Sequence, residues 1–580
     1  MPHRRVSVRL RTGVLLAGVV AGFLLLAAVP EGQQVQSRGR SGQIQAPQVP
    51  TVSVPRVTSP TIAVPDATHI AQNPAAAAQP WINPARLRSL IEARRRGLNY
   101  LPGEVLVKFK DGVGADGQTR ALQVLGTTQA ADTLEWAGRV AIVRDETQPD
   151  AYVLADRMKS QPEVEYAEPN YIVNLDPADW MDSPTPAQAP KPISRSNRGA
   201  TASNVAMIPN DSDYVAYQWN FQLIGMPGAW DIQPGGRTDL IVAVIDSGMT
   251  GGTGNLTYPI WNGSSFQTVS MPYAPNPDLP ASRQYLPKDF ASKVAGLPLV
   301  DLSGHGTHVS ATIGEATNNA FLVSGIAYNV QIMPLKVCLG YWDVAIAQAQ
   351  LGITGFPAGF TGPYDATCDY ASMASAIDYA VANGARVMNI SISGGEPSSI
   401  TLQNALVNAA SQGAFISVSM GNDFNKGNPT NYPAFYAASI DGVMSVAAVG
   451  PNSTRADYSS TGLHCEIAAP GGDSLGNSGR VDGGFVWQSA PISTDHALFQ
   501  STARFDRFNR VGVTGTSMAA PHVAGLAALL MSQNRSMTGA QVEKIIKMTA
   551  RDLGAVGQDE SFGYGLIQPR AALFGYGIRR

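Results

Sequence analysis

The chain has 580 residues, of which 44% are hydrophobic, and 41 Lys and Arg residues stand against 44 Asp and Glu residues. This length accommodates one large domain and a small one. The nearly balanced charge, with no basic block beyond the N-terminus, argues against a nucleic-acid partner. Three cysteines are too few for a disulfide-rich scaffold and lack the spacing of a metal site.

Residues 1–32 have the pattern of an export signal. Four arginines lie among the first eleven residues, and the apolar run Gly13–Val29 follows them. The run is at the lower length limit of a membrane span, so two outcomes stay open: a cleaved signal peptide, which we favour, or an uncleaved signal anchor. We expect an exported protein, secreted, periplasmic or at the cell envelope, that touches a membrane only through this segment if it stays uncleaved.

A linker, a small folded unit and a second linker are predicted next. Residues 33–98 are rich in Pro, Gln, Ser and Ala without hydrophobic periodicity, which predicts a disordered linker. The basic run 86–96 at its end is either a short solvated helix, which we favour, or a proteolytic target. Residues 99–175 alternate strand-like and helix-like segments in the order of a split βαβ sandwich, a small α+β ferredoxin-like unit. Residues 176–208 are again rich in Pro, Ser and Ala.

Residues 209–580 are predicted to form one α/β domain. Strand-like and helix-like segments alternate through it, which predicts a doubly wound parallel sheet with helices on both faces. The β-branched run Leu240–Ile245 is typical of a strand buried on both faces, and it ends at Asp246. The carboxyl edge of such a sheet is where α/β proteins place their sites.

An aspartate, a histidine and a serine follow one another along this domain. Asp246 ends a predicted strand, whereas His305 and Ser517 each follow a glycine turn at the start of a predicted helix. A helix N-terminus offers unpaired amides and a dipole that favour negative charge. A serine nucleophile needs an imidazole to take its proton, and the imidazole needs a carboxylate to fix its tautomer. The order Asp, His, Ser therefore predicts acyl transfer.

Four motifs carry a resemblance to a known family. They are Val244-Ile245-Asp246-Ser247-Gly248, His305-Gly306-Thr307-His308-Val309, Gly421-Asn422 and Gly515-Thr516-Ser517-Met518-Ala519-Ala520-Pro521-His522. In these motifs and their order, the chain resembles the subtilisin-like serine proteases, or subtilases. The resemblance implies that Asp246 orients His305, that His305 is the general acid and base, and that Ser517 is the nucleophile. It also implies that the Asn422 amide donates to the oxyanion.

Residues 99–175 resemble the propeptide of the same family. The similarity is carried by Pro102–Phe109 and Val164–Asn170. It implies an intramolecular chaperone and inhibitor whose tail lies in the active-site cleft. Processing is then expected within residues 176–208, which separate the two folded parts.

The resemblance extends to the substrate cleft. Members of the family bind peptides as an added β-strand, and Ser391, Ile392, Ser393 and Gly394 match the segment that pairs with the substrate. Asn431 stands at the base of a pocket where glycine is common. A polar side chain there predicts a preference for small or polar residues before the scissile bond.

Residues 312–325 resemble the calcium loop of the family. Asn319 would offer a side-chain oxygen, and Thr317, Phe321 and Val323 would offer backbone carbonyls, the hard ligands that Ca²⁺ prefers. A filled loop and an empty loop both stay open, and the sequence does not identify the remaining carboxylate ligand. The chemistry itself is expected to need no cofactor.

Taken together, the motifs predict an exported, monomeric serine endopeptidase that is made as a self-processing zymogen. Its partners are protein or peptide substrates and its own propeptide. Segments 250–300 and 339–369 are longer than the family pattern, and the second is expected at the rim of the cleft. Two rival hypotheses are a catalytically silent envelope protein that binds peptides and an anchored maturase with a single partner. Cys338 and Cys368 flank one loop and either pair or stay free thiols.

Overall fold

The computed structural model describes residues 79–125, 131–175, 179–182, 207–395, 397–473, 484–498 and 503–577. The predicted export signal 1–32 lies outside these residues, as do most of the two predicted linkers. Within the described ranges, no helix has the length and apolar character that a membrane span requires.

A seven-stranded parallel sheet is the centre of residues 207–577, the larger domain. Its order is β16-β15-β14-β13-β6-β10-β9. The strands are β6 (Ile241–Asp246), β9 (Lys288–Asp289), β10 (Gln331–Lys336), β13 (Val387–Ile390), β14 (Phe415–Ser419), β15 (Val443–Val449) and β16 (Ile467–Pro470). Every residue of β13, β14 and β15 is buried, as expected for a parallel sheet covered on both faces.

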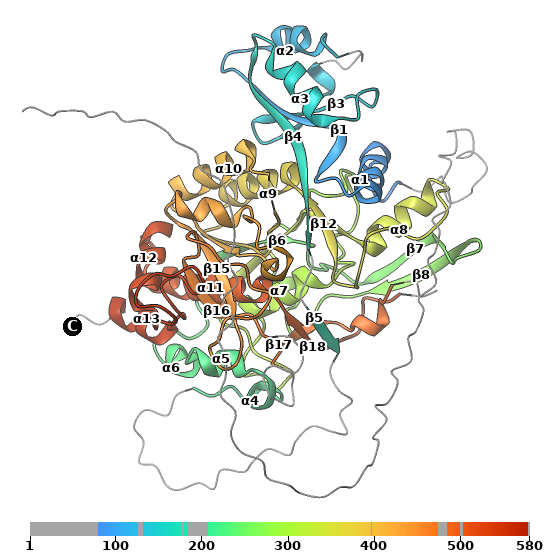
Figure 1. Cartoon of the computed structure of the whole chain (residues 1–580). Helices are drawn as coiled ribbons and strands as arrows, with labels where there is room; N and C mark the ends of the chain where they lie inside the picture. The colour runs from blue at the N-terminus through green and yellow to red at the C-terminus, as the bar shows by residue number, and fades with distance from the viewer. Residues whose placement is uncertain are drawn as a thin grey trace, which may run out of the picture. The chain divides into compact units, whose positions relative to one another are not determined.

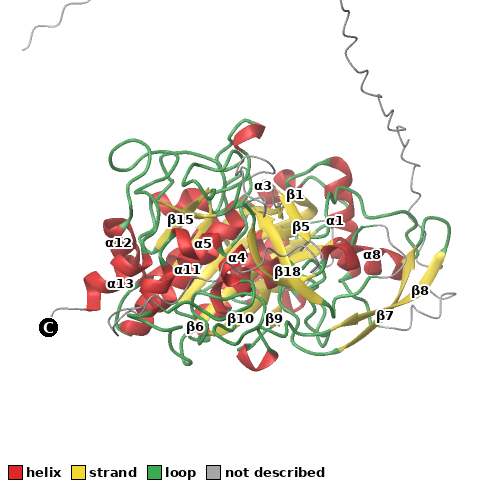
Figure 2. Cartoon of the chain, turned by 90° about the horizontal axis from the view of Figure 1, so that it is seen from below, coloured by secondary structure: helices red, strands yellow, loops and turns green. Residues whose placement is uncertain are grey.

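Helices lie on both sides of this sheet (Figures 1 and 2). The helices are α4 (Tyr214–Tyr217), α5 (Trp219–Leu223), α6 (Met226–Trp230), α7 (His305–Gly314), α9 (Tyr370–Ala382), α10 (Ile400–Ser411), α11 (Thr516–Gln533), α12 (Gly539–Thr549) and α13 (Pro569–Gly577). α7 packs against α11, and α9 packs against α10. Almost all of α11 is buried, as expected for a helix that is apolar all round. The predicted doubly wound α/β fold is confirmed.

Residues 100–175 form the predicted ferredoxin-like unit, the small domain. Its elements are β1 (Tyr100–Phe109), α2 (Ala115–Leu122), β2 (Glu135–Ala137), β3 (Val140–Arg144), α3 (Ala151–Lys159) and β4 (Val164–Leu175). β1 lies between β3 and β4 and is antiparallel to both. The hydrophobic alternation of the sequence therefore predicted the two helices and three of the four strands, but not the short β2.

The sheet of the small domain continues into the larger domain. Figure 1 shows β4 running from one into the other, where it pairs antiparallel with β12 (Ala366–Asp369). β12 pairs in turn with β11 (Cys338–Gly340), and a disulfide joins Cys338 to Cys368 across this pair. Of the two alternatives for these cysteines, the structure has the disulfide. Cys465 is a buried free thiol.

The last part of residues 33–98 contains α1 (Pro84–Arg96), so the short helix expected in the basic run is present and the prediction of a disordered linker is wrong there. The Asn83 side chain accepts hydrogen bonds from two N–H groups of the first turn, and a proline occupies that turn. Leu87 and Leu90 are buried on one face of the helix. The many arginines concealed this short apolar face.

The second predicted linker, 176–208, also contains an ordered strand. β5 (Asp179–Asp182) pairs antiparallel with β18 (Phe508–Thr514), which pairs on its other side with β17 (Val486–Pro491). The composition of the segment gave no indication of this strand, because its partner lies more than 300 residues further along the chain.

The long segments 250–300 and 339–369 build a lobe beside the central sheet. β7 (Gly254–Trp261) and β8 (Phe266–Tyr273) form a hairpin, and α8 (Tyr341–Gln350) packs against β7. Figure 2 shows the hairpin projecting at the edge of the molecule. The apolar side chains of this lobe form a cluster apart from the main core.

Candidate active site

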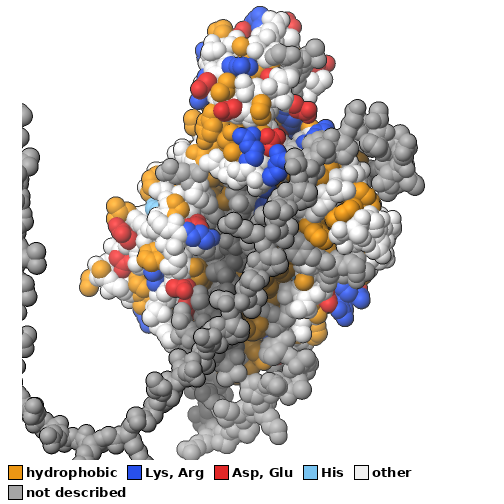
Figure 3. All heavy atoms as spheres, turned by 45° about the vertical axis from the view of Figure 1, so that its right-hand side comes forward, with side chains coloured by type: hydrophobic (Ala, Val, Ile, Leu, Met, Phe, Trp, Pro, Cys, Tyr) orange, Lys and Arg blue, Asp and Glu red, His pale blue; other side chains and the backbone are white. Residues whose placement is uncertain are grey.

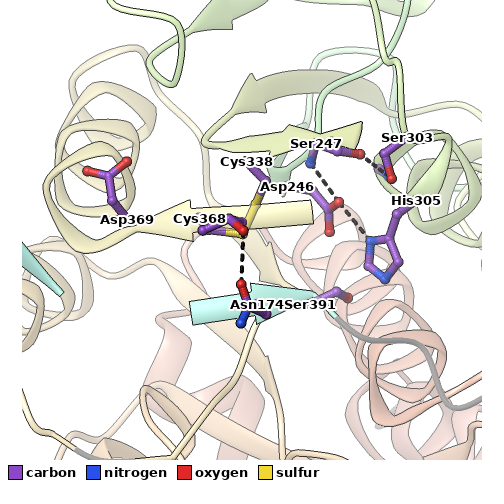
Figure 4. Close-up of a disulfide and its surroundings, with 12 residues drawn as sticks. Asn174, Asp246, Ser247, Ser303, His305, Cys338, Cys368, Asp369 and Ser391 are labelled. Carbon is purple, nitrogen blue, oxygen red and sulfur yellow. Dashed lines mark hydrogen bonds and ion pairs between the residues drawn. A yellow bond between two sulfur atoms is a disulfide. The ribbon is translucent and has the colours of Figure 1, made fainter. Parts of the chain in front are cut away.

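The first two predicted site residues meet where β6 ends and α7 begins. Asp246 is the last residue of β6, and His305 is the first residue of α7. His305 Nδ1 lies 2.8 Å from Asp246 Oδ1, and both side chains are buried (Figure 4). The carboxylate can only accept from this nitrogen, so Nδ1 carries the hydrogen and Nε2 is left to take up a proton.

The absence of a side chain at Gly306 lets α7 approach the end of β6. The Gly306 N–H donates to Ser247 Oγ at 2.8 Å. A Cβ at this position would lie 2.3 Å from the carbonyl oxygen of Gly248. Any larger residue would therefore move His305 away from Asp246.

Asp301 is a residue of this site that the sequence analysis missed. Its carboxylate accepts hydrogen bonds from three backbone N–H groups of the turn into α7. It also accepts from the hydroxyl of Ser247, the residue after Asp246. Asp301 thus fixes the turn that carries His305 relative to the end of β6. An acidic residue just before a helix was the available sequence signal.

Ser517 lies in the first turn of α11 and contacts the segment after β13. Its hydroxyl donates to the Ser391 carbonyl at 2.9 Å, and the Ser391 hydroxyl donates to the Ser517 carbonyl at 2.7 Å. Among the described residues, His305 Nε2 has no hydrogen-bond partner. Asp246 and His305 are therefore hydrogen-bonded to each other, whereas the Ser517 hydroxyl is hydrogen-bonded to Ser391 and not to His305. The serine has to leave this bond before His305 can take its proton.

Asn422 lies beside Ser517. Its Oδ1 accepts from the N–H and the hydroxyl of Thr516, both at 2.9 Å. These bonds orient the carboxamide, and its Nδ2 lies near Gly515. A cavity of about 470 Å³ is lined by Ser391, Ser393, Gly394, Asn422 and Ser517, among other residues. An amide donor and a hydroxyl thus share one cavity, as an oxyanion site requires.

The end of β4 forms another wall of this cavity, from Ile172 to Leu175. Val173 lies so close to Gly394 that a Cβ on this glycine would be 2.3 Å from Val173 Cγ2. β4 also pairs with β12. It therefore enters the cavity as an added strand with β12 beside it and Gly394 against it, which is how extended peptides dock at a sheet edge.

Two predicted cleft residues lie away from the cavity wall. The Ile392 side chain is fully buried in the main core. Asn431 is also buried and donates to Ser460 Oγ at 2.9 Å. Its Oδ1 has no hydrogen-bond partner in the described part of the chain. Asn431 packs against Gly421, the residue before Asn422.

Two carboxylates that the sequence analysis did not single out lie against the predicted calcium loop. Asn319 Nδ2 donates to Asp278 Oδ1 at 2.7 Å, and the Asn318 N–H donates to Asp211 Oδ2 at 2.7 Å. Asp278 Oδ2 is buried and without a hydrogen-bond partner among the described residues. Burial raises the pKa of Asp278 to about 7, and the charge of Asp211 adds to this.

This loop is rich in oxygen atoms, several of which accept hydrogen bonds within the loop, among them Asn319 Oδ1 from the Phe321 N–H at 3.0 Å. Its Asn318, Ala320 and Leu322 have positive φ angles of 63°, 61° and 37°. The described residues contain no group of three or more His, Cys, Asp or Glu side chains able to hold a metal. A cation here would therefore rely on amide and backbone oxygens as well as carboxylates, a donor set that suits Ca²⁺ rather than a transition metal. The residues that offer such oxygens are Asp211, Asp278, Thr317, Asn319, Phe321 and Val323.

Family models match both folded parts of the chain. The model described as the subtilase family matches residues 237–565, and the model described as the fervidolysin N-terminal prodomain matches residues 89–170. A thermophilic serine proteinase from Bacillus sp. strain AK1 is 27% identical over 81% of this chain and 86% of its own length. An extracellular protease from Xanthomonas campestris is 30% identical over 64% of this chain and 57% of its own length.

A solved structure has the same fold. Fervidolysin from Fervidobacterium pennivorans matches with a TM-score of 0.55 and 22% identity, over 83% of this chain and 62% of that one. At this level of identity the likeness concerns the fold alone.

The Asp246–His305 contact predicts a pH dependence. Burial lowers the pKa of His305, but the charge and hydrogen bond of Asp246 outweigh it and raise the pKa above its ordinary value of 6.5. A proton acceptor must be neutral, so peptide hydrolysis should rise with pH through this pKa. We expect the acid limb of kcat/KM above pH 6.5. Burial holds the pKa of His308 at about 3 and of His522 at about 4, so neither produces this limb.

The Asp246→Asn variant tests whether the acid limb of the kcat/KM profile comes from His305 and its contact with Asp246. Loss of the charge should move the limb to lower pH and reduce kcat by roughly 10⁴-fold, the scale measured when the corresponding carboxylate of a serine protease triad is replaced in this way. An acid limb that stays at the same pH in Asp246→Asn would contradict the assignment of His305.

Proposed function

Because the chain belongs to the subtilase family of serine proteases, we propose that it is an exported endopeptidase made as a self-processing zymogen. Asp246, His305 and Ser517 are its triad. The observation that carries this proposal is the 2.8 Å Asp246–His305 contact next to a cleft that holds Ser517 and Asn422. Export is supported by the pattern of residues 1–32 and by a relative named as an extracellular protease.

The proposed reaction begins when a peptide carbonyl replaces the end of β4 beside Ser517. Ser517 Oγ gives its proton to His305 Nε2 and forms a bond to the carbonyl carbon. The Asn422 amide and the Ser517 N–H donate to the oxyanion, and Asp246 stabilises the imidazolium. The C–N bond then breaks, His305 protonates the leaving amine, and water hydrolyses the acyl-enzyme by the same route.

Side chains of the small domain cap the N-termini of two helices of the larger domain, and these contacts support an inhibitory role for the small domain. The Glu168 carboxylate of β4 accepts from the N–H groups of Ile400 and Thr401 at the start of α10. Asn170 Oδ1 accepts from the Ala371 N–H at the start of α9. Helix N-termini leave N–H groups without intrahelical partners and favour negative charge, so these contacts stabilise the docked small domain.

The two strands on either side of Ser517 suggest where the chain cuts itself. β4 ends at Leu175 in the cavity, and β5 begins at Asp179 on β18, which leads into the turn that carries Ser517. Leu175 lines the same cavity as Ser517, and Asp179 pairs with Thr514, three residues before Ser517, so both ends of this interval lie close to the serine. We therefore place the self-cleavage at a bond between Leu175 and Asp179.

An intact-mass time course of the purified chain tests self-processing. The parent should be cut, with a new N-terminus between residues 176 and 179, whereas Ser517→Ala should stay intact because it lacks the nucleophile. Ser536→Ala, which changes an exposed serine in the same part of the chain, is the control and should behave as the parent.

The other outcomes of this time course separate the rival hypotheses. A parent chain that stays intact would support the silent peptide binder. Equal cutting of the parent and Ser517→Ala would exclude self-cleavage by Ser517. A new N-terminus well beyond Asp182 would mean that the end of β4 is only a bound inhibitor and that the cut lies elsewhere.

We further propose that Asn431 influences which residue precedes the scissile bond. The proposal is supported by the resemblance, which puts Asn431 at the base of a pocket where glycine is common. It is also supported by Asn431 Oδ1, which is buried and has no hydrogen-bond partner in the described part of the chain. Cleavage mapping on a peptide library should show small or polar residues there, and Asn431→Gly should admit larger ones. A preference of the parent for large aromatic residues would contradict the proposal.

We also propose that the loop around Asn319 binds a structural calcium ion, held with Asp211 and Asp278. Calcium that binds only the folded state would raise the free energy of unfolding by about 2.7 kcal/mol at a calcium concentration of 100 times Kd. EGTA should therefore lower the Tm of the Ser517→Ala chain by a few degrees, and readdition of Ca²⁺ should restore it.

Two variants separate calcium binding from a general effect of EGTA. Asp278→Asn should lose the response to Ca²⁺, because it removes a carboxylate ligand. The exposed Asp441→Asn should keep it. A Tm of the unsubstituted loop that does not respond to Ca²⁺ would show that the loop is empty.

A further inference from the structure

A groove apart from the cleft holds the stretch that precedes the small domain. Trp81 and Ile82 are only 2% and 1% exposed. They belong to the apolar cluster of the lobe, whose members from the larger domain include Leu256, Ile260, Trp342 and Ile346. We call the surface formed by β7, β8, α8 and their neighbours the lobe groove. Because this cluster is separate from the main core, Trp81 is held by the lobe and not by the cleft.

Polar contacts fix Trp81 within the lobe groove. Its indole Nε1–H donates to Asp343 Oδ1 at 2.8 Å, and its backbone N–H donates to Gln350 Oε1 at 2.8 Å. Asp343 is itself paired with buried Lys336 at 2.9 Å. Gln350 Nε2 donates to the Gln79 carbonyl at 3.2 Å. A buried tryptophan with its N–H satisfied is typical of an anchor residue in a binding interface.

α1 leads from this anchor towards the cleft. Buried Arg86 pairs with Asp369, the residue that ends β12 and caps α9. Arg94 donates to the Gly359 carbonyl at 2.6 Å and to Asn174 Oδ1 at 2.9 Å, so it contacts both the lobe and the end of β4. Its guanidinium also lies 3.9 Å from the centre of the Phe360 ring. Figure 3 shows basic side chains gathered where the small domain meets the rest of the protein.

We propose that the lobe groove is a second docking site for the pro region, the chain up to Leu175. Its occupant is the segment Gln79–Arg96, with Trp81 as the anchor. Through this site the pro fragment stays on the catalytic domain after the chain between them has been cut. The proposal rests on the proposed zymogen function, but the docking itself requires no proteolysis by this chain.

Two separate attachments give the pro fragment a bivalent hold. While Trp81 is seated, the end of β4 is kept near the cleft at an effective concentration that reaches the millimolar range for short links. A tail that leaves the cavity therefore returns before a substrate replaces it. A cut near residues 175–179 would not release an active enzyme by itself; the segment around Trp81 also has to leave or be degraded.

The test separates docking from self-processing by using the full chain in the Ser517→Ala background. A recognition site for an unrelated, sequence-specific protease is inserted within residues 185–205, and that protease makes the cut. β5 stays on the pro fragment in the parent and in every variant, so the change in Kd relative to the parent is what reports on the lobe groove. Size-exclusion chromatography and a dilution series then give the Kd of the two fragments. Because the added enzyme cuts, failure of the proposed self-processing does not affect the result.

Trp81→Ala should weaken the complex about 100-fold, or about 2.7 kcal/mol, because it removes a buried anchor. Gln350→Ala, on the groove side, should weaken it about tenfold, since it removes both hydrogen bonds to the segment. Arg95→Ala is the matched control, because Arg95 is exposed on α1. It should leave the Kd unchanged.

Trp81→Phe and the unfolding temperatures of the uncut chains show whether a variant binds weakly because it has lost the anchor or because it is misfolded. Trp81→Phe keeps an aromatic ring but loses the N–H donor, and should fall between the parent and Trp81→Ala. Parent fragments that separate at micromolar concentration would overturn the proposal. So would Trp81→Ala and Gln350→Ala fragments that bind as tightly as the parent. If Trp81→Ala does not fold, Gln350→Ala and Trp81→Phe decide the question.

Discussion

The antiparallel pairing of β4 with β12 is the interaction on which the rest of the structure depends. It continues the sheet of the small domain into the larger one and carries the end of β4 into the cavity beside Ser517. β12 would otherwise present unpaired backbone groups at a sheet edge, and the Cys338–Cys368 disulfide ties it to β11. Backbone pairing places few demands on side chains, so a peptide substrate can use the same edge once β4 has left.

The parallel sheet explains how residues far apart in the sequence meet at this cavity. Asp246 ends β6, and Ser391 and Asn422 follow β13 and β14. These three strands are neighbours in the sheet, so all three residues lie at its carboxyl edge. α7 and α11 pack together and bring the starts of both helices, with His305 and Ser517, to the same region. With β4 in place, the Ser517 hydroxyl donates to the Ser391 carbonyl, as we propose for the resting state of the nucleophile.

The sequence predicted those parts of the fold and site that depend on local patterns. The β-branched run before Asp246 and the glycine turns before His305 and Ser517 located the ends of elements, and the fold class followed from their alternation. Features that depend on distant partners could not be predicted. α1 is stabilised by the lobe, and Asp278 reaches Asn319 from a segment without a family pattern. The basic run 86–96 and the Asn83–Pro84 helix start were the local signals of α1.

The reactivity of Ser517 tests most directly whether the pro region holds the site in its resting state. The maturing chain is treated with a fluorophosphonate that labels activated serines, and the label is located by intact-mass and peptide mass spectrometry. If the pro region holds the site in its resting state, the label appears on Ser517 of the catalytic fragment, in step with loss of the pro fragment, while the uncut chain stays unlabelled. An uncut chain that is labelled on Ser517 as fast as the cut one would contradict it.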